Sequence, residues 1–225
     1  MLYLLANNGL LSGRASGNVY QRNGRVRGFK VPALVQNTYT NSARNRFGTN
    51  SSDWNSLTDD ERNSWINASG YTTSDRFGRT IPLVGKQLFV SLNNNLAAVG
   101  IPTIADAPLP ELVDSLTALL PGTFDNSAGT LSLAFTPDPS PDGNSILVFA
   151  TAAQSAGTSK PGKSKYRLIT TFPSGSISPI GIGADYVSKF GSPAVGSKIF
   201  LKAISINETT GQAGVPVFAM TTVVA

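Results

Sequence analysis

The chain has 225 residues, 18 of them basic and 13 acidic, and it contains neither Cys nor His. These missing side chains exclude disulfide bonds, Ser-His-Asp and Cys-His triads, thiol redox chemistry, and the usual ligation of zinc, haem or iron–sulfur clusters. Charged residues make up 14% of the chain, whereas roughly 25% is usual in globular domains. We therefore expect a folded protein that is not an enzyme and binds no cofactor or metal.

Positive charge is concentrated at the N-terminus. Residues 1–50 carry a net charge of +7 and no carboxylate, while residues 51–225 carry a net charge of −2. The seven basic residues are Arg14, Arg22, Arg25, Arg27, Lys30, Arg44 and Arg46. Guanidinium groups pair with carboxylates and with phosphates, so the segment is predicted to contact a neighbouring subunit or nucleic acid. A subunit is favoured because Gly and Asn outnumber the arginines and no Lys-rich run is present.

Residues 1–39 are predicted to form an extended basic arm. Glycines recur too often there for a helix, and Asn23-Gly24 is a strong hairpin signal between short strands at 18–22 and 26–31. The apolar run at residues 1–6 is too short for a signal peptide, so we expect synthesis in a cytoplasm without N-terminal export. No stretch reaches the length of a membrane span.

Residues 40–104 are predicted to form a small helical unit. Thr58 and Glu61 fit a capping box and, with acidic residues in the first turn, favour a helix from Asp59 to about Ala68. This explains the carboxylate cluster at 59–61 more simply than a metal or acid–base site does. Another helix would end before Gly100 and present an apolar face made of Leu88, Phe89, Leu92 and Leu96. The residues expected to anchor the helical core are Phe47, Trp54, Leu57 and Trp65.

Residues 105–122 are predicted to be a linker, in which Leu112, Leu116 and Leu119 could form a short helix. After Pro121 the apolar pattern changes to a period of two, which is typical of strands. No helical segment is expected among these strands, so residues 123–225 are predicted to form an antiparallel β-sandwich. The predicted strands are 130–136, 145–153, 165–172, 198–207 and 215–224. The predicted fold class is α+β multidomain, with an arm, a helical unit and a sandwich.

Two further patterns suggest ligand sites. Asp138, Asp142 and Asn144 could hold calcium, but the proline-rich run around them is mainly a turn sequence without EF-hand spacing. The run Gly181 to Asp185 is faintly like a dinucleotide-binding loop, but it lacks the third glycine and a surrounding βαβ unit. Neither pattern is taken as a site.

Widely spaced motifs in residues 9–110 carry a resemblance. They are Gly17-x-Val19-Tyr20, Asn23-Gly24-Arg25-x-Arg27, Arg46-Phe47, Trp54-x-x-Leu57-x-x-x-Glu61-Arg62-x-x-Trp65, Gly85-x-x-Leu88-Phe89 and Gly100-x-Pro102. This region resembles an uncharacterised family found in phages and in bacterial genomes, including Bacteroidota, and departs from its usual pattern at residues 36–40. The resemblance implies no activity.

The C-terminal part is similar to the last two strands of fibronectin type III and other immunoglobulin-like modules. The similarity rests on Lys198-x-Phe200-x-Lys202-Ala203 and Asn207-x-x-x-Gly211 before a final strand. Such modules are common on virion surfaces, where they bind or decorate. The resemblance therefore implies a presented, rigid β domain.

The function expected from these features is that of a non-enzymatic virion structural protein, made in the host cytoplasm and located in the virion. It would be a capsid, decoration, neck or tail subunit that assembles through its arm and helices with copies of itself and other virion proteins. One alternative is a nucleic-acid-binding protein that uses the basic arm. Another is an adhesin or filament subunit that binds glycans.

Overall fold

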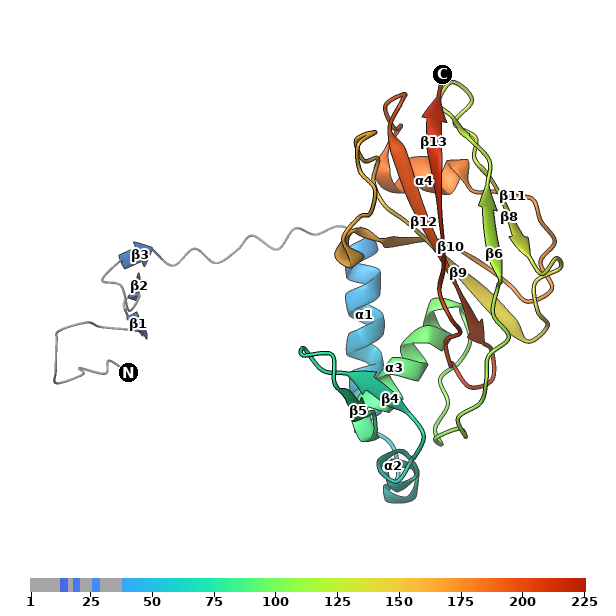
Figure 1. Ribbon diagram of the computed structural model, residues 1–225. Coiled ribbons are helices and arrows are strands. Elements are labelled where there is room, and N and C mark those ends of the chain that lie inside the picture. The colour runs from blue at the N-terminus through green and yellow to red at the C-terminus, as the bar shows by residue number, and fades with distance from the viewer. Residues whose placement is uncertain (1–12, 16–17, 21–25, 29–37) are drawn as a thin grey trace. The chain divides into compact units, whose positions relative to one another are not determined.

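The computed structural model describes residues 13–15, 18–20, 26–28 and 38–225, with side chains from residue 41 onward (Figure 1). The chain divides into two compact units, Met1–Asn41 and Ser42–Ala225. In the first unit, three strands pair antiparallel in the order β1-β2-β3; they are Gly13–Ala15, Asn18–Tyr20 and Val26–Gly28. The strands predicted on either side of Asn23-Gly24 correspond to β2 and β3, and that turn lies outside the described residues.

Three helices and a hairpin precede the large sheets. The helices are α1 (Thr38–Asp53), α2 (Asp59–Ile66) and α3 (Gly85–Ala98), and the hairpin pairs β4 (Thr72–Ser74) with β5 (Thr80–Pro82). The predicted capping box of α2 is confirmed: the Thr58 N–H donates to Glu61 Oε2 at 2.6 Å, and the Glu61 N–H donates to Thr58 Oγ1 at 3.3 Å. The predicted end of α3 is also confirmed, because Gly100 has φ 80° and the Ile101 N–H bonds the Leu96 carbonyl at 3.0 Å.

The core of the helical part centres on Phe89 of α3. The ring centroid of Phe89 lies 5.2 Å from that of Trp65 and 5.5 Å from that of Trp54, and Leu57 packs against the same cluster. Phe47 does not belong to it, contrary to the prediction, because its side chain is 58% exposed. Helix α1 ends at Asp53, so Phe47 lies on this helix and Trp54 lies just beyond it.

Two sheets share one large apolar core. The five-stranded sheet has the order β10-β9-β12-β13-β7, and the three-stranded sheet has the order β11-β8-β6. Side chains from both sheets form a single buried cluster, which includes Phe135 of β8, Val148 of β9 and Leu201 of β12. The sheet strands are β6 (Ala118–Pro121), β7 (Phe124–Asp125), β8 (Ser132–Thr136), β9 (Asn144–Ala150), β10 (Arg167–Phe172), β11 (Ile180–Gly181), β12 (Lys198–Asn207) and β13 (Val217–Val224).

The sheet-rich C-terminal part agrees with the prediction, and three details differ. The β13–β7 pair is parallel, so the larger sheet is mixed rather than wholly antiparallel. Helix α4 (Gly183–Phe190) lies between β11 and β12, where no helix was expected. The predicted short helix at Leu112, Leu116 and Leu119 is wrong: Leu119 lies in β6, and the other two lie in irregular chain. Leu116 and Leu119 are buried because they pack into the core between the sheets.

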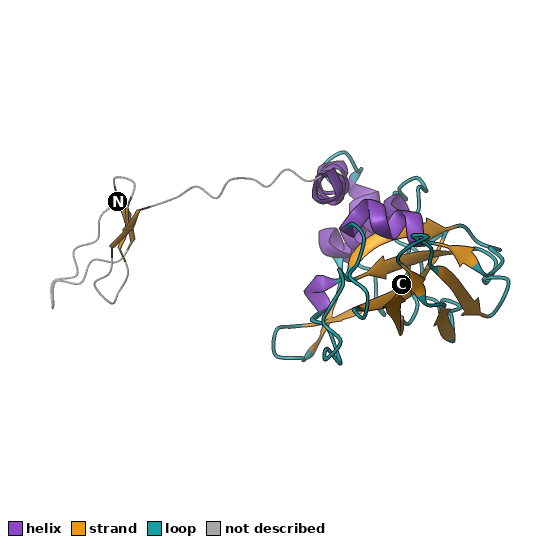
Figure 2. Ribbon diagram, turned by 90° about the horizontal axis from the view of Figure 1, so that it is seen from above, coloured by secondary structure: helices purple, strands orange, loops and turns teal. Residues whose placement is uncertain are grey.

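The helical part and the sheets belong to the same compact unit. Figure 1 shows α2 and α3 at the end of the sheets far from the C-terminus, and Figure 2 shows the helices gathered to one side of the strands. The connection between α3 and the sheets is direct, because Asn95 Nδ2 donates to the Gly211 carbonyl, in the β12–β13 connection, at 2.8 Å.

Candidate functional site

A groove lies over the outer face of β12 and β13. Alternation along β12 sends Ile199, Leu201 and Ala203 into the core and leaves the residues between them on the opposite face of the sheet. Pairing with β13 places Phe200 opposite Met220 and Lys202 opposite Phe218. The groove has a volume of about 870 Å³, and its lining residues are Ser159, Lys160, Pro161, Lys163, Tyr166, Phe200, Lys202, Pro216, Phe218, Ala219 and Met220.

Aromatic rings surround the ammonium group of Lys202. Its Nζ lies 4.2 Å from the ring centroid of Phe149 and 5.8 Å from that of Tyr166. The Tyr166 ring in turn meets Phe218 edge to face, with the centroids 6.0 Å apart. Burial lowers the pKa of Lys202 and raises the pKa of the Tyr166 phenol. Within the described part of the chain no carboxylate forms a salt bridge with Lys202. Its ammonium group instead makes cation–π contacts with these two rings.

The groove is positive and partly apolar. Its lining contains three lysines, Lys160, Lys163 and Lys202, and no Asp or Glu. The Phe218 side chain is 57% exposed, and Met220 is exposed beside it. This combination suits a ligand that brings a carboxylate or phosphate together with an apolar group, because the lysines supply charge and the rings supply contact area.

Charge is segregated along the compact unit in a way that the sequence analysis missed. Residues 41–142 hold six basic and eleven acidic side chains, a net charge of −5, whereas residues 143–225 hold seven basic and two acidic ones, a net charge of +5. The summed value of −2 for residues 51–225 conceals this division. The signal was present in the sequence, because Asp185 is the only acidic residue between Asp142 and Glu208.

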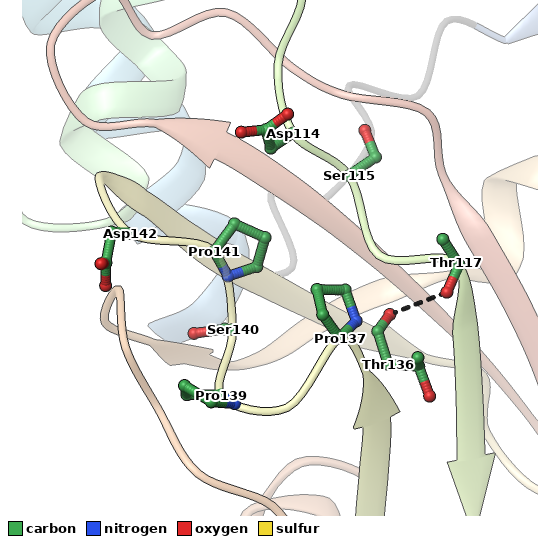
Figure 3. Close-up of a pocket in the computed structure, with 9 residues that line it drawn as sticks. All are labelled: Asp114, Ser115, Thr117, Thr136, Pro137, Pro139, Ser140, Pro141 and Asp142. Carbon is green, nitrogen blue, oxygen red and sulfur yellow. Dashed lines mark hydrogen bonds between the residues drawn. The ribbon is translucent and has the colours of Figure 1, made fainter.

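A second hollow, of about 590 Å³, is acidic. Asp114 and Asp142 line it from separate segments, together with hydroxyl groups and prolines of the 136–141 run (Figure 3). Thr117 Oγ1 donates to the Thr136 carbonyl at 3.3 Å, at the edge of the hollow where β6 and β8 pair. Asp138, considered as a calcium ligand, instead accepts hydrogen bonds from Ser178 N–H at 2.9 Å and Ser178 Oγ at 2.8 Å. These contacts join the run at residues 136–141 to the loop that contains Ser178.

The predicted basic contact residues fall into three groups. Arg14 and Arg27 lie in β1 and β3, and Arg22, Arg25 and Lys30 lie outside the described residues. Arg44 and Arg46 lie on α1, where Arg44 is exposed.

Arg46 is brought near basic residues from distant parts of the chain. Burial, then repulsion from the charges of Arg167 and Arg46, lowers the pKa of Lys189. This meeting of α1, β10 and α4 could not be inferred from sequence spacing. It adds a second concentration of positive charge to that of the groove.

No protein-family model matches the chain, and no curated protein or solved structure is similar to it. In the described ranges, no helix combines the length and apolar character that crossing a bilayer requires.

Proposed function

We propose that this chain is a non-enzymatic structural subunit of a virion, in a capsid, decoration layer, neck or tail, and that it assembles through its basic arm and helices. The observation that carries the proposal is the number of large apolar side chains exposed on the compact unit. Contiguous exposed apolar surface marks interfaces with other proteins, and two pairs of these side chains are neighbours: Leu109 with Leu112 in one segment, and Phe218 with Met220 on β13. The most exposed of these side chains are Phe77, Leu109, Leu112, Ile177 and Val215.

The order of the strands supports an immunoglobulin-like arrangement. The sheet β6-β8-β11 has the order of strands A, B and E of that fold, and β10-β9-β12-β13 has the order of C′, C, F and G. Helix α4 stands where the chain passes from E to F, which is a departure from the simplest form of the fold. A rigid sandwich of this kind suits presentation on a particle surface.

The basic arm supports attachment to neighbours. Five basic residues and no acidic residue occur in residues 1–40, so carboxylates on the −5 part of an adjacent copy are complementary to the arm. Arms that reach several neighbours would add multivalent attachment without further contacts in the compact unit.

The lysine groove favours nucleic-acid binding as the second candidate function. Stacking rings beside basic side chains are the usual components of single-strand binding surfaces. On this alternative, affinity falls steeply as salt rises, because bound phosphates release counterions when the protein replaces them. The two functions differ in whether nuclease treatment changes the mass of the purified protein.

The test is sedimentation of the full-length protein in moderate salt after nuclease treatment, compared with a variant lacking residues 1–37. The truncation stops before α1 because Asn50 is buried and its Nδ2 donates to Asn94 Oδ1 at 2.9 Å. We expect a large, discrete full-length species and a folded truncation that no longer forms this species. A truncated chain that assembles normally would refute attachment through the arm. A full-length monomer that retained nucleic acid until nuclease treatment would favour the second candidate.

A further inference from the structure

A fixed segment of irregular chain presents a leucine to solvent. Leu112 is 100% exposed, although hydrogen bonds hold the backbone on both sides of it. The Glu111 N–H donates to Gln212 Oε1 at 2.9 Å, and Gln212 Nε2 donates to the Leu109 carbonyl at 2.8 Å. Ser115 Oγ donates to the Val113 carbonyl at 3.1 Å and accepts from the Val215 N–H at 2.9 Å. The Leu112 side chain is therefore solvent-exposed although hydrogen bonds fix the backbone around it.

Carboxylates flank this leucine. Glu111 and Asp114 lie within two residues of Leu112 and are exposed or partly exposed. Segment 109–114 thus joins an apolar side chain to two negative charges. It is the chemical complement of the groove described above, which joins the rings of Tyr166 and Phe218 to three lysines.

We propose that Leu112 of one copy docks in the lysine and aromatic groove of a second copy, with Glu111 and Asp114 facing Lys160, Lys163 and Lys202. The carboxylates would give Lys202 the anionic partner that the described residues of its own chain do not supply. The proposal rests on the proposed function in taking a second copy as the partner, and it names an interface formed without the arm.

Two observations favour a second copy over another acidic protein. The segment lies in the part of the chain with a net charge of −5, and the groove lies in the part with a net charge of +5, so every copy carries both halves of the contact. In addition, the hydrogen bonds to Gln212 and Val215 fix the segment in place, and Leu112 is exposed there rather than buried in its own groove. Complementary charges also guide the approach of two surfaces.

The test uses two full-length variants, each of which removes one half of the contact. Leu112→Ser removes the docked side chain, and Phe218→Ser removes a ring of the groove. Each should raise the Kd of self-association at least tenfold in concentration-dependent sedimentation, as expected for a central interface residue. Val195→Ser is the matched control, because Val195 is as exposed as Phe218 and lies outside both the groove and the segment. It should leave the Kd unchanged.

Mixing the two variants separates a lost contact from a misfolded chain. The Phe218→Ser chain keeps an intact Leu112, and the Leu112→Ser chain keeps an intact groove, so an equimolar mixture should form a heterologous pair that neither variant forms alone. Failure of the mixture to associate would overturn the proposal. A Leu112→Ser chain that assembles like the wild type would overturn it too, while leaving assembly through the arm standing.

Binding of a single-stranded oligothymidylate tests whether the groove binds nucleic acid rather than a second copy. Lys202→Met should weaken self-association and should not change retention of the oligonucleotide. If Lys202→Met instead abolished oligonucleotide binding and left the mass unchanged, the groove would be a nucleic-acid site and the proposed contact would be wrong. A wild-type chain that stays monomeric at all concentrations would contradict both this contact and the proposed function.

Discussion

Substituting Gly211 by Ala should destabilise the protein through a clash between the sheets and α3. Gly211 lies in the β12–β13 connection with φ 70°, a left-handed conformation. A Cβ atom added there would lie 2.4 Å from the Leu92 carbonyl oxygen and 3.0 Å from a side-chain carbon of Leu96. The closest of these atoms belongs to the helix backbone, so the clash cannot be relieved by rotating a side chain.

The expected loss of unfolding free energy has two parts, and a second glycine allows them to be measured separately. Left-handed backbone costs a non-glycine residue roughly 1–2 kcal/mol, and overpacking adds about 1–3 kcal/mol. Gly143 has φ 69°, and an added Cβ atom there would meet nothing within 4 Å. Gly143→Ala should therefore show only the first cost, and Gly211→Ala should show both.

Urea unfolding followed by tryptophan fluorescence and by circular dichroism measures this difference. Trp54 and Trp65, the only tryptophans, report on the helical part, while circular dichroism reports on the sheets. We expect one coincident transition for each protein and a larger loss of unfolding free energy for Gly211→Ala. Equal losses for the two variants, or separate transitions for the two probes, would refute the close packing of α3 on the sheets.

Three other substitutions test the core and the helix cap. Asn93 is fully buried and makes two hydrogen bonds with the backbone of Ile104, at 2.8 and 3.2 Å. Asn93→Leu should lower the free energy of unfolding in urea by about 2–5 kcal/mol, because the N–H and the carbonyl of Ile104 both lose their hydrogen-bond partners. Asn95→Ala, which removes one hydrogen bond, is the comparison. An equally small loss of unfolding free energy for Asn93→Leu would contradict this reasoning. Burial raises the pKa of Tyr186 to about 12. The phenol ionises first in the unfolded chain, so the contribution of Tyr186 to stability should be constant below pH 10 and fall between pH 10 and about 12. Tyr186→Phe should remove this fall and the last step of the phenolate absorbance titration. Hydrogen bonds from Thr58 lower the pKa of Glu61, so the stability it contributes above the ordinary carboxyl pKa is lost as the pH falls. Glu61→Gln, which can still accept both bonds but cannot ionise, should show a smaller acid-side drop in Tm, and an unchanged drop would argue against the capping role.

Sequence patterns predicted the helix and strand boundaries that depend on neighbouring residues. The capping box of α2 and the end of α3 at Gly100 depend on residues within one or two turns, so the sequence contains their whole explanation. Strand β13 alternates between less and more exposed residues because one of its faces lies toward the core, whereas β9 is buried along almost its whole length and carries a continuous run of apolar residues. Helix α4 was not predicted, because it begins at a glycine and because its main contact is distant in the sequence. The fully buried ring of Tyr186 packs against that of Phe124, with the ring centroids 5.4 Å apart. Leu112, Leu116 and Leu119 have helical spacing, but Leu116 and Leu119 pack into the core between the sheets from non-helical chain, and Leu112 is exposed.

The candidate site was out of reach for a related reason. The groove forms only when β12 pairs with β13 and residues 159–166 pass beside them, so Tyr166, Lys202 and Phe218 have no shared sequence motif. The division into an acidic part and a basic part is present in the sequence, but the net charge of −2 for residues 51–225 averages over both parts. The N-terminal arginines lie close together in the sequence and therefore predict a contact surface in the arm, whereas Lys160 and Lys163 are about forty residues from Lys202 and meet it only in the fold.

The parallel pairing of β13 with β7 affects when the protein can fold during synthesis. Val223 pairs with Phe124, and β13 lies between β12 and β7. The larger sheet therefore joins segments about a hundred residues apart, and contacts of such long range form late. While residues 217–224 are still inside the ribosome, β7 and β12 each lack a neighbour, and the ring of Phe218 is not yet in place. A nascent chain at this stage thus has no completed groove.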